Sequence, residues 1–331
     1  MGFLNILITI VGTLAWIIII FSLTSRLWRY IREQQMLDIS NRWVIVTGCD
    51  TGIGFGVMKK LLDEGASVIA FNYTEQGAQQ ALKLGAKLAP WFDITDEDAV
   101  KTAVREVEAV CEGKIWGLVH NAGLVRAGFI EYQPLENYHR LMDVNFYAVV
   151  NLTQQLIPLI KPTQGRIVVV SSVDGIVSLP GNAPYDAAKF AVEAYVDALR
   201  IELSYWGVNV AVINPSTLKT PLAMSFFETH RQTWEAMDKL DPEGKWKQTF
   251  TAEWLDSYVE QNTRSIESIA EDPQKAVKNI FHAIAGKYPR MRYLSGRLAN
   301  TIFYALWVMP EHLAFKLKKG TVNPLPNIDK T

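Results

Sequence analysis

The fold class follows from the stretch Trp43-Val44-Ile45-Val46-Thr47-Gly48-Cys49-Asp50-Thr51-Gly52-Ile53-Gly54. Its first half is a short apolar run, which predicts a strand buried on both faces of a parallel sheet. Residues 55–64 then predict a helix. A strand, a glycine turn and a helix N-terminus form a cradle for phosphate, because glycines let the backbone approach and the helix end presents N–H groups. The stretch therefore predicts nucleotide binding, although its Gly-x-x-x-Gly-x-Gly spacing differs from the Gly-x-Gly-x-x-Gly fingerprint.

The end of the next predicted strand, residues 66–71, indicates which dinucleotide would bind. At this point a dinucleotide-binding fold places an acid for a ribose hydroxyl or a base for a 2′-phosphate. The chain has Phe71-Asn72-Tyr73 there, and no Arg or Lys lies in the glycine turn. Asn72 is the best-placed polar side chain for the ribose, and Asp50 would not favour a 2′-phosphate. The sequence thus favours NAD over NADP.

Strands and helices continue to alternate along the chain. The predicted strands are 87–91, 115–120, 166–171 and 208–214, and the predicted helices are 97–111, 135–160 and 183–206. Such alternation is typical of a parallel sheet with helices on both faces. The expected fold is therefore α/β, a Rossmann-like doubly wound parallel sheet over residues 41–296.

Tyr185 and Lys189 are four residues apart in one predicted helix, so they share a face. A free phenol has a pKa of about 10, and a nearby ammonium favours the phenolate. We therefore expect Tyr185 to act as a general acid and base, with its pKa lowered by Lys189. Ser171 and Ser172 precede the pair. The spacing also occurs by chance on solvated helices, so this interpretation depends on the nucleotide site.

The composition excludes several other classes of protein. The chain has 331 residues, 49% of them hydrophobic, and a formal net charge of -1. This length is enough for one large domain, and the near-neutral charge gives no reason to expect a nucleic acid partner. Cys49 and Cys111 are the two cysteines and form no Cys/His cluster. We therefore expect neither a disulfide framework nor a metal site.

The first 30 residues predict a membrane anchor. Residues 2–23 contain no charged residue, and some twenty apolar residues in a helix span a bilayer core of about 30 Å. A cleavable signal peptide would have a shorter apolar core and a basic start, whereas here Arg26, Arg29 and Arg32 follow the apolar run. We expect a single-pass protein of the endoplasmic reticulum whose catalytic domain faces the cytosol, because flanking positive charges stay cytoplasmic. A buried core helix is the alternative.

Several motifs in a fixed order resemble the short-chain dehydrogenase/reductase family over about residues 41–296. They are Thr47-Gly48-x-x-x-Gly52-x-Gly54, Asp93, Asn121-Ala122-Gly123, Asn145, Ser172, Tyr185-x-x-x-Lys189, and Pro215 with Thr220. The turn from Thr47 to Gly52, the N-terminal anchor and Tyr288-Pro289-Arg290-Met291-Arg292-Tyr293 resemble the branch of membrane-bound retinol and hydroxysteroid dehydrogenases. Mitochondrial 3-hydroxybutyrate dehydrogenases share much of the pattern. His120 and Ser216 depart from it, since the family has Asn and Gly there.

The resemblance implies roles for individual residues. Tyr185 would exchange the hydroxyl proton, Ser172 would hydrogen-bond the substrate oxygen, and Lys189 would hold the nicotinamide ribose. Asn145 corresponds to the family position that holds a water in a proton relay. The expected cofactor contacts are Gly48, Asp50, Thr51, Gly52, Ile53, Gly54, Asn72, Asp93, Ile94, Asn121, Ala122, Gly123, Tyr185, Lys189, Pro215, Leu218 and Thr220. A homodimer is expected because pairing between subunits is usual in the family.

The remaining segments concern the substrate. Residues 220–272 predict a lid over a lipophilic ligand, with the aromatic residues Phe226, Phe227, Trp234, Trp246, Phe250, Trp254 and Tyr258. Ordinary helix packing explains any single one of them equally well. Residues 297–331 form an amphipathic tail that would dock on a bilayer surface or pack on the domain.

The predicted function is reversible oxidation of a lipophilic alcohol, such as a retinoid or steroid, with NAD. A 3-hydroxy acid substrate would instead need a cationic clamp for its carboxylate. His230, Arg231 and Lys239 could supply one, so this alternative stays open. A binding protein that kept the fold without catalysis is a third hypothesis.

Overall fold

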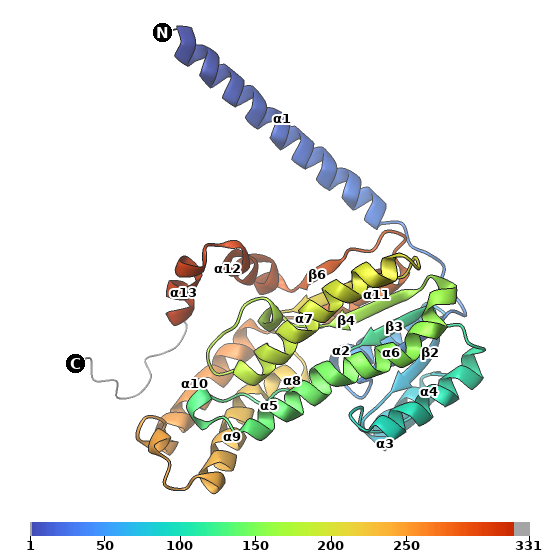
Figure 1. The fold of residues 1–331 in the computed structure, drawn as a ribbon, viewed down its shortest axis with the longest axis vertical. Helices are drawn as coiled ribbons and strands as arrows, with labels where there is room; N and C mark the ends of the chain where they lie inside the picture. The colour runs from blue at the N-terminus through green and yellow to red at the C-terminus, as the bar shows by residue number, and fades with distance from the viewer. Residues whose placement is uncertain (1, 321–331) are drawn as a thin grey trace.

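The computed structural model describes residues 2–320, apart from some side chains of the first helix. Helix α1 (Gly2–Glu33) projects away from an α/β domain, and two short helices near the C-terminus lie against another side of that domain (Figure 1). The domain is built around one sheet of six strands, which are β1 (Trp43–Thr47), β2 (Ser67–Phe71), β3 (Gly117–His120), β4 (Arg166–Val170), β5 (Asn209–Pro215) and β6 (Arg292–Ser295).

All neighbouring strands are parallel, in the order β2-β1-β3-β4-β5-β6. The chain moves outward from β1 to β2 and then crosses back to β3 on the other side of β1. Strand order therefore reverses between β1 and β3, and the crevice above such a reversal is where open α/β sheets bind ligands. The predicted doubly wound parallel sheet is confirmed.

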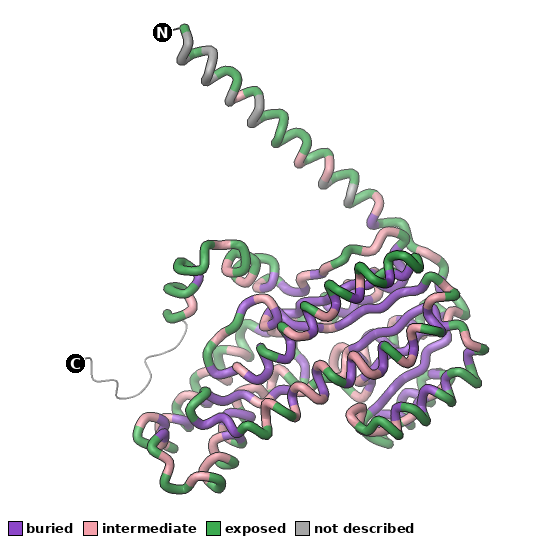
Figure 2. The backbone as a smooth tube through the Cα atoms, viewed as in Figure 1, coloured by how far each residue is buried: buried purple, intermediate pink, exposed green. Residues whose placement is uncertain are grey.

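Helices cover both faces because the strands are apolar on both faces. Val44 and Val46 of β1 face one core, which is completed by α2 (Gly52–Asp63), α3 (Glu75–Lys83) and α11 (Gln274–Ala285). Ile45, which alternates with them, faces the other core, completed by α4 (Glu97–Cys111), α6 (Ala148–Ile160) and α7 (Ala183–Ser204). Figure 2 shows this buried interior running along the strands.

Two predicted elements differ from the structure. Residues 87–91 form no strand and make only isolated bridges, Ile69 to Leu88 and Asn72 to Trp91, because Pro90 has no N–H for a ladder at this sheet edge. Residues 135–160 are not one regular helix. They form α5 (Leu135–Met142), a π-helical turn (Asp143–Tyr147) and α6, and the turn contains Asn145. Single π turns inside helices are frequent at functional sites.

The segment predicted as a lid is helical and has a small core of its own. It contains α8 (Pro221–Met224), α9 (Phe226–Leu240), the 3-10 turn Lys245–Gln248 and α10 (Ala252–Ile269). Trp246 and Phe250 are buried here against Phe129 and Tyr132, with Trp234 and Trp254 packed around them. Ordinary packing is thus the role of these four lid aromatics. Further 3-10 turns are Ile130–Tyr132, Lys161–Thr163 and Val173–Gly175.

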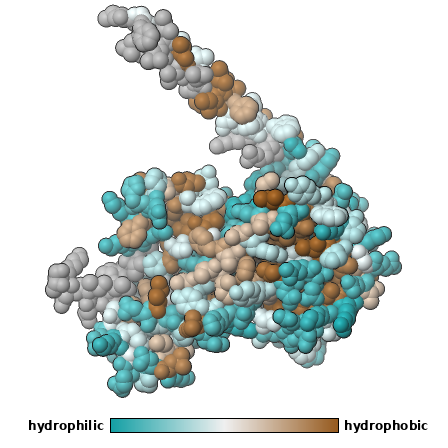
Figure 3. All heavy atoms as spheres, viewed as in Figure 1, coloured by the Kyte–Doolittle hydropathy of each residue, from teal (hydrophilic) through white to brown (hydrophobic). Residues whose placement is uncertain are grey.

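Helix α1 carries exposed apolar side chains, seen as brown spheres along the projecting helix in Figure 3. Trp16 and Phe21 are also exposed. In the part of the chain that the structure describes, no helix combines the length and apolar character needed to cross a bilayer. The predicted span therefore stays a prediction, and the side chains of Arg26 and Arg29 lie outside the described set.

After β6 the chain forms a π turn (Ala299–Phe303), α12 (Tyr304–Val308) and α13 (Glu311–Lys319), which leave apolar side chains such as Trp307 and Phe315 exposed. The rest of the predicted tail, residues 321–331, lies outside the description.

Candidate active site

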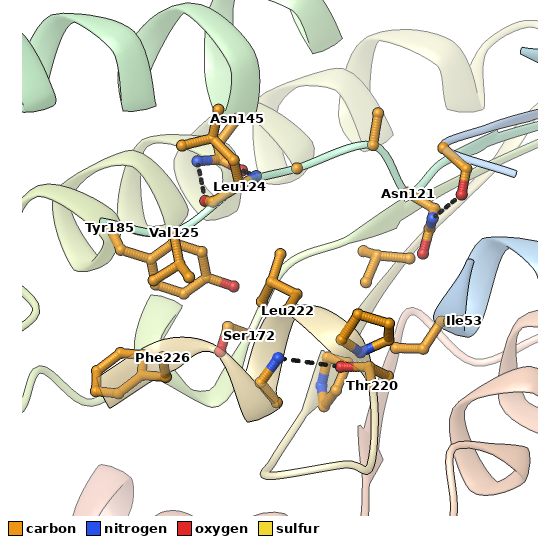
Figure 4. A pocket seen from close by; sticks show the side chains of 18 of the residues that line it. Ile53, Asn121, Leu124, Val125, Asn145, Ser172, Tyr185, Thr220, Leu222 and Phe226 are labelled. Carbon is orange, nitrogen blue, oxygen red and sulfur yellow. Dashed lines mark hydrogen bonds between the residues drawn. The ribbon is translucent and has the colours of Figure 1, made fainter. Parts of the chain in front are cut away.

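A cavity of about 780 Å³ opens above the carboxyl ends of the strands, at the reversal between β1 and β3. Its lining contains all the predicted catalytic residues and all the predicted cofactor residues except Gly54. Figure 4 shows Tyr185, Ser172 and Asn145 around one part of this space and Ile53, Asn121 and Thr220 around another. The fold therefore gathers motifs that lie far apart in the sequence.

The glycines of the first turn are required by the backbone. Gly48 and Gly52 have φ angles of 69° and 62°, in the left-handed region that favours glycine. A Cβ on Gly54 would lie 2.1 Å from the carbonyl oxygen of Gly48, so a side chain cannot fit there. The turn leads directly into α2, whose first residue is Gly52. The N-terminus of this helix, with Gly52 and Ile53, thus borders the cavity, and helix N-termini are favourable sites for anions.

Thr47 and Asn121 brace this turn against the end of β3. The Thr47 hydroxyl accepts hydrogen bonds from the backbone N–H groups of Asn121 and Ala122, at 3.0 and 2.9 Å. The Asn121 amide donates to the carbonyl oxygens of Thr47 and Gly48, both at 3.1 Å. Asn121 was predicted to line the cleft, and it also fixes the shape of the turn.

An acidic group stands at the end of β2, although that strand has none of its own. The Asp50 carboxylate accepts hydrogen bonds from the N–H groups of Tyr73 and Thr74 and from the Thr74 hydroxyl, at 2.8, 2.9 and 2.6 Å. Gly77 leaves room for it, since a Cβ there would lie 2.4 Å from Asp50 Oδ1. Asp50 therefore occupies the place in which dinucleotide-binding folds position an acid for the ribose hydroxyls.

Asn72, predicted to serve the ribose, is only 3% exposed. Its amide nitrogen donates to the carbonyl oxygen of Ala70 at 2.7 Å, and its buried amide oxygen has no partner among the described residues. An orphaned acceptor in the wall of this cavity is suited to a donor on a ligand. The glycine cradle, Asp50 and Asn72 together fit a dinucleotide.

Asp93 pairs with Arg140 at 2.7 Å and accepts two hydrogen bonds from Thr95. Burial raises its pKa, but the Arg140 and Thr95 contacts outweigh that effect and hold the pKa below its ordinary value. Asp93 and the neighbouring Ile94 line the cavity as expected. The ion pair with Arg140 was not predicted.

Tyr185 and Lys189 lie on one face of α7, with the Lys189 ammonium 5.4 Å from the centre of the Tyr185 ring. The ammonium donates a hydrogen bond to the carbonyl oxygen of Val170 at 3.1 Å. The predicted lowering of the Tyr185 pKa is wrong for this structure: burial raises that pKa, and Asp174 raises it further. Burial also lowers the pKa of Lys189 to about 8. Both shifts follow from removing the charged forms from water.

Ser172 has an acidic neighbour inside the site. Its hydroxyl donates to Asp174 Oδ2 at 3.0 Å and accepts from the Asp174 N–H at 3.1 Å. Tyr185 packs against Val125, and its hydroxyl points toward Ser172 (Figure 4). Asp174 was missed at the sequence level, although a Ser followed two residues later by Asp is a local signal for such a turn.

Asn145 is anchored on both sides of its amide group. Its oxygen accepts from the Leu124 N–H at 3.2 Å, and its nitrogen donates to the Leu124 carbonyl at 3.0 Å (Figure 4). These bonds join the π turn to the strand end after Gly123, where a Cβ would lie 2.7 Å from the Asn145 oxygen. The relay role of Asn145 stays a prediction.

The end of β5 and the chain after it form another wall of the cavity, next to the glycine turn. Pro215, Leu218 and Thr220 line it, and the Thr220 hydroxyl caps α8 by accepting from the Ala223 N–H at 3.2 Å. Ser216, which stands where the family has Gly, has its N–H 2.9 Å from the carbonyl oxygen of Ser295. The substitution is accommodated because Ser216 does not adopt a positive φ, the conformation that would favour glycine.

The cationic clamp considered for a hydroxy acid does not form. His230 is fully buried, 3.0 Å from the Tyr132 hydroxyl, and burial lowers its pKa to about 3, so it is neutral. Arg231 is paired with Glu228 and Asp256. Neither these two residues nor Lys239 is in the cavity lining. Three lid aromatics do line it, namely Phe226, Phe227 and Tyr258.

This arrangement defines a nicotinamide-dinucleotide oxidoreductase site, with a glycine turn, a carboxylate at the end of β2 and a Ser-Tyr-Lys group in one cavity. Residues 42–231 match the sequence profile of the family described as short chain dehydrogenase. The chain belongs to the short-chain dehydrogenase/reductase family and is an NAD(P)-dependent dehydrogenase acting on CH–OH groups.

Its relatives include retinol and hydroxysteroid dehydrogenases. Human retinol dehydrogenase 16 is 33% identical, covering 87% of this chain and 91% of its own. Rat 17-beta-hydroxysteroid dehydrogenase type 6 is also 33% identical, with the same coverage. Bovine dehydrogenase/reductase SDR family member 9 is 31% identical over 94% of this chain and 99% of its own. A short chain dehydrogenase from Burkholderia cenocepacia, solved with NADP, has the same fold, with a TM-score of 0.62 at 22% identity over 87% of this chain and all of its own.

Proposed function

We propose that the protein interconverts a lipophilic alcohol, of the retinoid or hydroxysteroid class, and its aldehyde or ketone, with NAD as the cofactor. The observation that carries this proposal is that Ser172, Tyr185 and Lys189 line the same cavity as the lid aromatics Phe226, Phe227 and Tyr258. Apolar walls with a few convergent polar groups suit a lipophilic ligand. The names of the relatives support the same substrate class.

The nicotinamide of the dinucleotide supplies the hydride acceptor or donor. In reduction, Tyr185 gives a proton to the carbonyl oxygen from its protonated form, which its raised pKa favours. In oxidation, its ionised form takes the hydroxyl proton of the substrate. Ser172 positions that oxygen beside the Tyr185 hydroxyl. Lys189 keeps a positive charge beneath the ring and is fixed by its bond to Val170. Val125, Leu141 and Phe226 pack around Tyr185 and limit access of water to it.

A substrate panel tests the proposal. We expect NADH to form with all-trans-retinol or 5α-androstane-3α,17β-diol in detergent, and to form more slowly with 3-hydroxybutyrate, because His230, Arg231 and Lys239 provide no clamp in the cavity. Formation of NADH from 3-hydroxybutyrate alone would favour the hydroxy acid alternative. If no alcohol yields NADH or NADPH, and the protein still binds dinucleotide, the non-catalytic hypothesis takes its place.

We also propose that the protein is attached to the endoplasmic reticulum membrane through α1, with the catalytic domain on the cytosolic side. Support comes from the exposed apolar side chains of this helix, which include Trp16, Ile18 and Phe21. Removal of residues 1–33 is expected to move the protein from the membrane pellet to the supernatant. Alkaline extraction of the full chain separates the modes of attachment, since a spanning helix stays in the pellet and a surface helix is released. Full-length protein in the supernatant before extraction would contradict attachment.

A homodimer is proposed from family membership alone. Its check is the mass of the purified protein in detergent by light scattering.

A further inference from the structure

Asp174 is an acidic side chain in the wall of the cavity, two residues beyond Ser172. Among the described residues its only hydrogen-bond partner is Ser172, and it forms no salt bridge with any of them. The other carboxylates of the cavity are better satisfied, since Asp93 is paired with Arg140 and Asp50 accepts three hydrogen bonds. Asp174 therefore differs from these two carboxylates, because it can accept further hydrogen bonds.

A purely apolar alcohol would leave this carboxyl group in an unfavourable state. Such a ligand would displace water from the cavity and offer Asp174 no hydrogen bond in return. Burying a polar group without a partner is costly, and more so for a charged one. Burial already raises the pKa of Asp174 to about 6, against the opposing effects of Ser172 and Lys189. A substrate that carries a hydrogen-bond donor at this point would remove the cost.

The geometry indicates where that donor would lie on the substrate. In the proposed function the reacting oxygen binds within hydrogen-bond distance of Ser172 Oγ, and Asp174 Oδ2 is 3.0 Å from the same Oγ. A hydroxyl on the carbon next to the reacting one lies about one hydrogen-bond length from the reacting oxygen. A hydroxyl has one proton to donate, and Ser172 gives its proton to Asp174 when no substrate is bound. The adjacent substrate hydroxyl can replace Ser172 as the donor to Asp174, which leaves the Ser172 O–H for the reacting oxygen.

We propose that Asp174 is a specificity-determining residue that accepts a hydrogen bond from a second hydroxyl adjacent to the reacting one, so that the site prefers vicinal diols to simple alcohols. This inference rests on the proposed function and narrows its substrate class. It assigns Asp174 to substrate contact, whereas Tyr185 and Ser172 serve the reacting oxygen itself.

The test compares matched alcohols that differ by one hydroxyl. The pairs are estriol with 17β-estradiol and trans-1,2-cyclohexanediol with cyclohexanol, each measured with saturating NAD. For the wild-type protein we expect kcat/KM to favour each diol by about tenfold or more, because a site built to bond a hydroxyl discriminates against the analogue without it. Asp174→Leu should abolish or reverse this preference. Asp174→Asn should give an intermediate ratio, since its amide oxygen still accepts.

The control is Asp98→Leu, which removes an exposed carboxylate on α4 outside the cavity and should keep the wild-type ratio. Should Asp174→Leu fail to bind NAD or melt early, the wild-type and Asp174→Asn ratios decide. A wild-type ratio of one or less, or an unchanged ratio in the Asp174 variants, overturns the inference.

Equilibrium dialysis of labelled estriol and estradiol with the NAD complex gives the same ratio without turnover. A diol preference in dialysis without NADH formation from any alcohol would contradict the proposed function and retain the inference. NADH formation from retinol, without a diol preference that depends on Asp174, would support the proposed function and overturn the inference.

Discussion

Replacing Tyr185 by Phe is expected to lower kcat by roughly 10²–10⁴-fold while leaving the affinity for dinucleotide nearly intact. The substitution removes the hydroxyl that exchanges a proton with the substrate oxygen, and positioned acid-base groups contribute about that factor. It keeps the ring, which packs with Val125 and Leu141 and lies beneath the Lys189 ammonium. The cofactor cradle around Gly48 and Gly52 is made by other elements. The Tyr185→Phe variant should therefore lose turnover and keep its affinity for the dinucleotide.

The measurement is steady-state oxidation of the best alcohol in the panel, with dinucleotide affinity taken from fluorescence titration. Tyr195→Phe, on the same helix but outside the cavity lining, is the matched control and should keep kcat within a few-fold. Retention of turnover by the Tyr185 variant would refute the assignment of the proton to this residue.

Replacing Asp50 by Asn is expected to shift the cofactor preference toward NADP by about a hundredfold. The carboxylate is held at the end of β2 by the N–H groups of Tyr73 and Thr74, where it would lie against a 2′-phosphate. Juxtaposition of like charges costs several kcal/mol, and each 1.4 kcal/mol corresponds to about a factor of ten. The near-isosteric amide removes the charge and keeps one of the two acceptor oxygens, so part of the hydrogen bonding to Tyr73 and Thr74 is retained.

The quantity to measure is kcat/KM for NAD divided by that for NADP, in the wild type and the variant. Asp98→Asn, a change of equal charge on an exposed part of α4, should leave the ratio unaltered. A wild-type protein that already prefers NADP would contradict both the NAD proposal and the role given to Asp50.

The order of the elements could be read from the chain because each depends on local pattern. Apolar runs such as 43–46 are unfavourable on a surface, so they become central parallel strands. Residues 97–111 form the predicted helix α4. The exception at 87–91 has a local reason in Pro90. The π turn at Asn145 could not be predicted in this way. It is accompanied by two hydrogen bonds between the Asn145 side-chain amide and the backbone of Leu124, which is distant in sequence.

The sequence predicted which residues form the candidate site, and the structure corrected the predicted direction of the Tyr185 pKa shift. Sequence spacing brought Tyr185 and Lys189 to one helix face, but it could not show how deeply the phenol is buried or that Asp174 lies beside it. Both conditions raise the pKa of Tyr185, the opposite of the shift expected from the pair alone. Likewise, the sequence showed that Trp246 and Phe250 are apolar. It could not show that they pack in the core of the lid instead of lining the cavity.

The sequence by itself determined the parallel α/β fold, the glycine turn, the family and the Ser172-Tyr185-Lys189 group, because periodicity and backbone requirements act between near neighbours. Only the tertiary structure decided which acids enter the cavity. Asp50 reaches the end of β2 from the glycine turn of β1, and Asp174 turns back onto Ser172 within the wall of the cavity. Charges act through space and through the burial around them, so their effects on cofactor and substrate choice depend on how the whole chain packs.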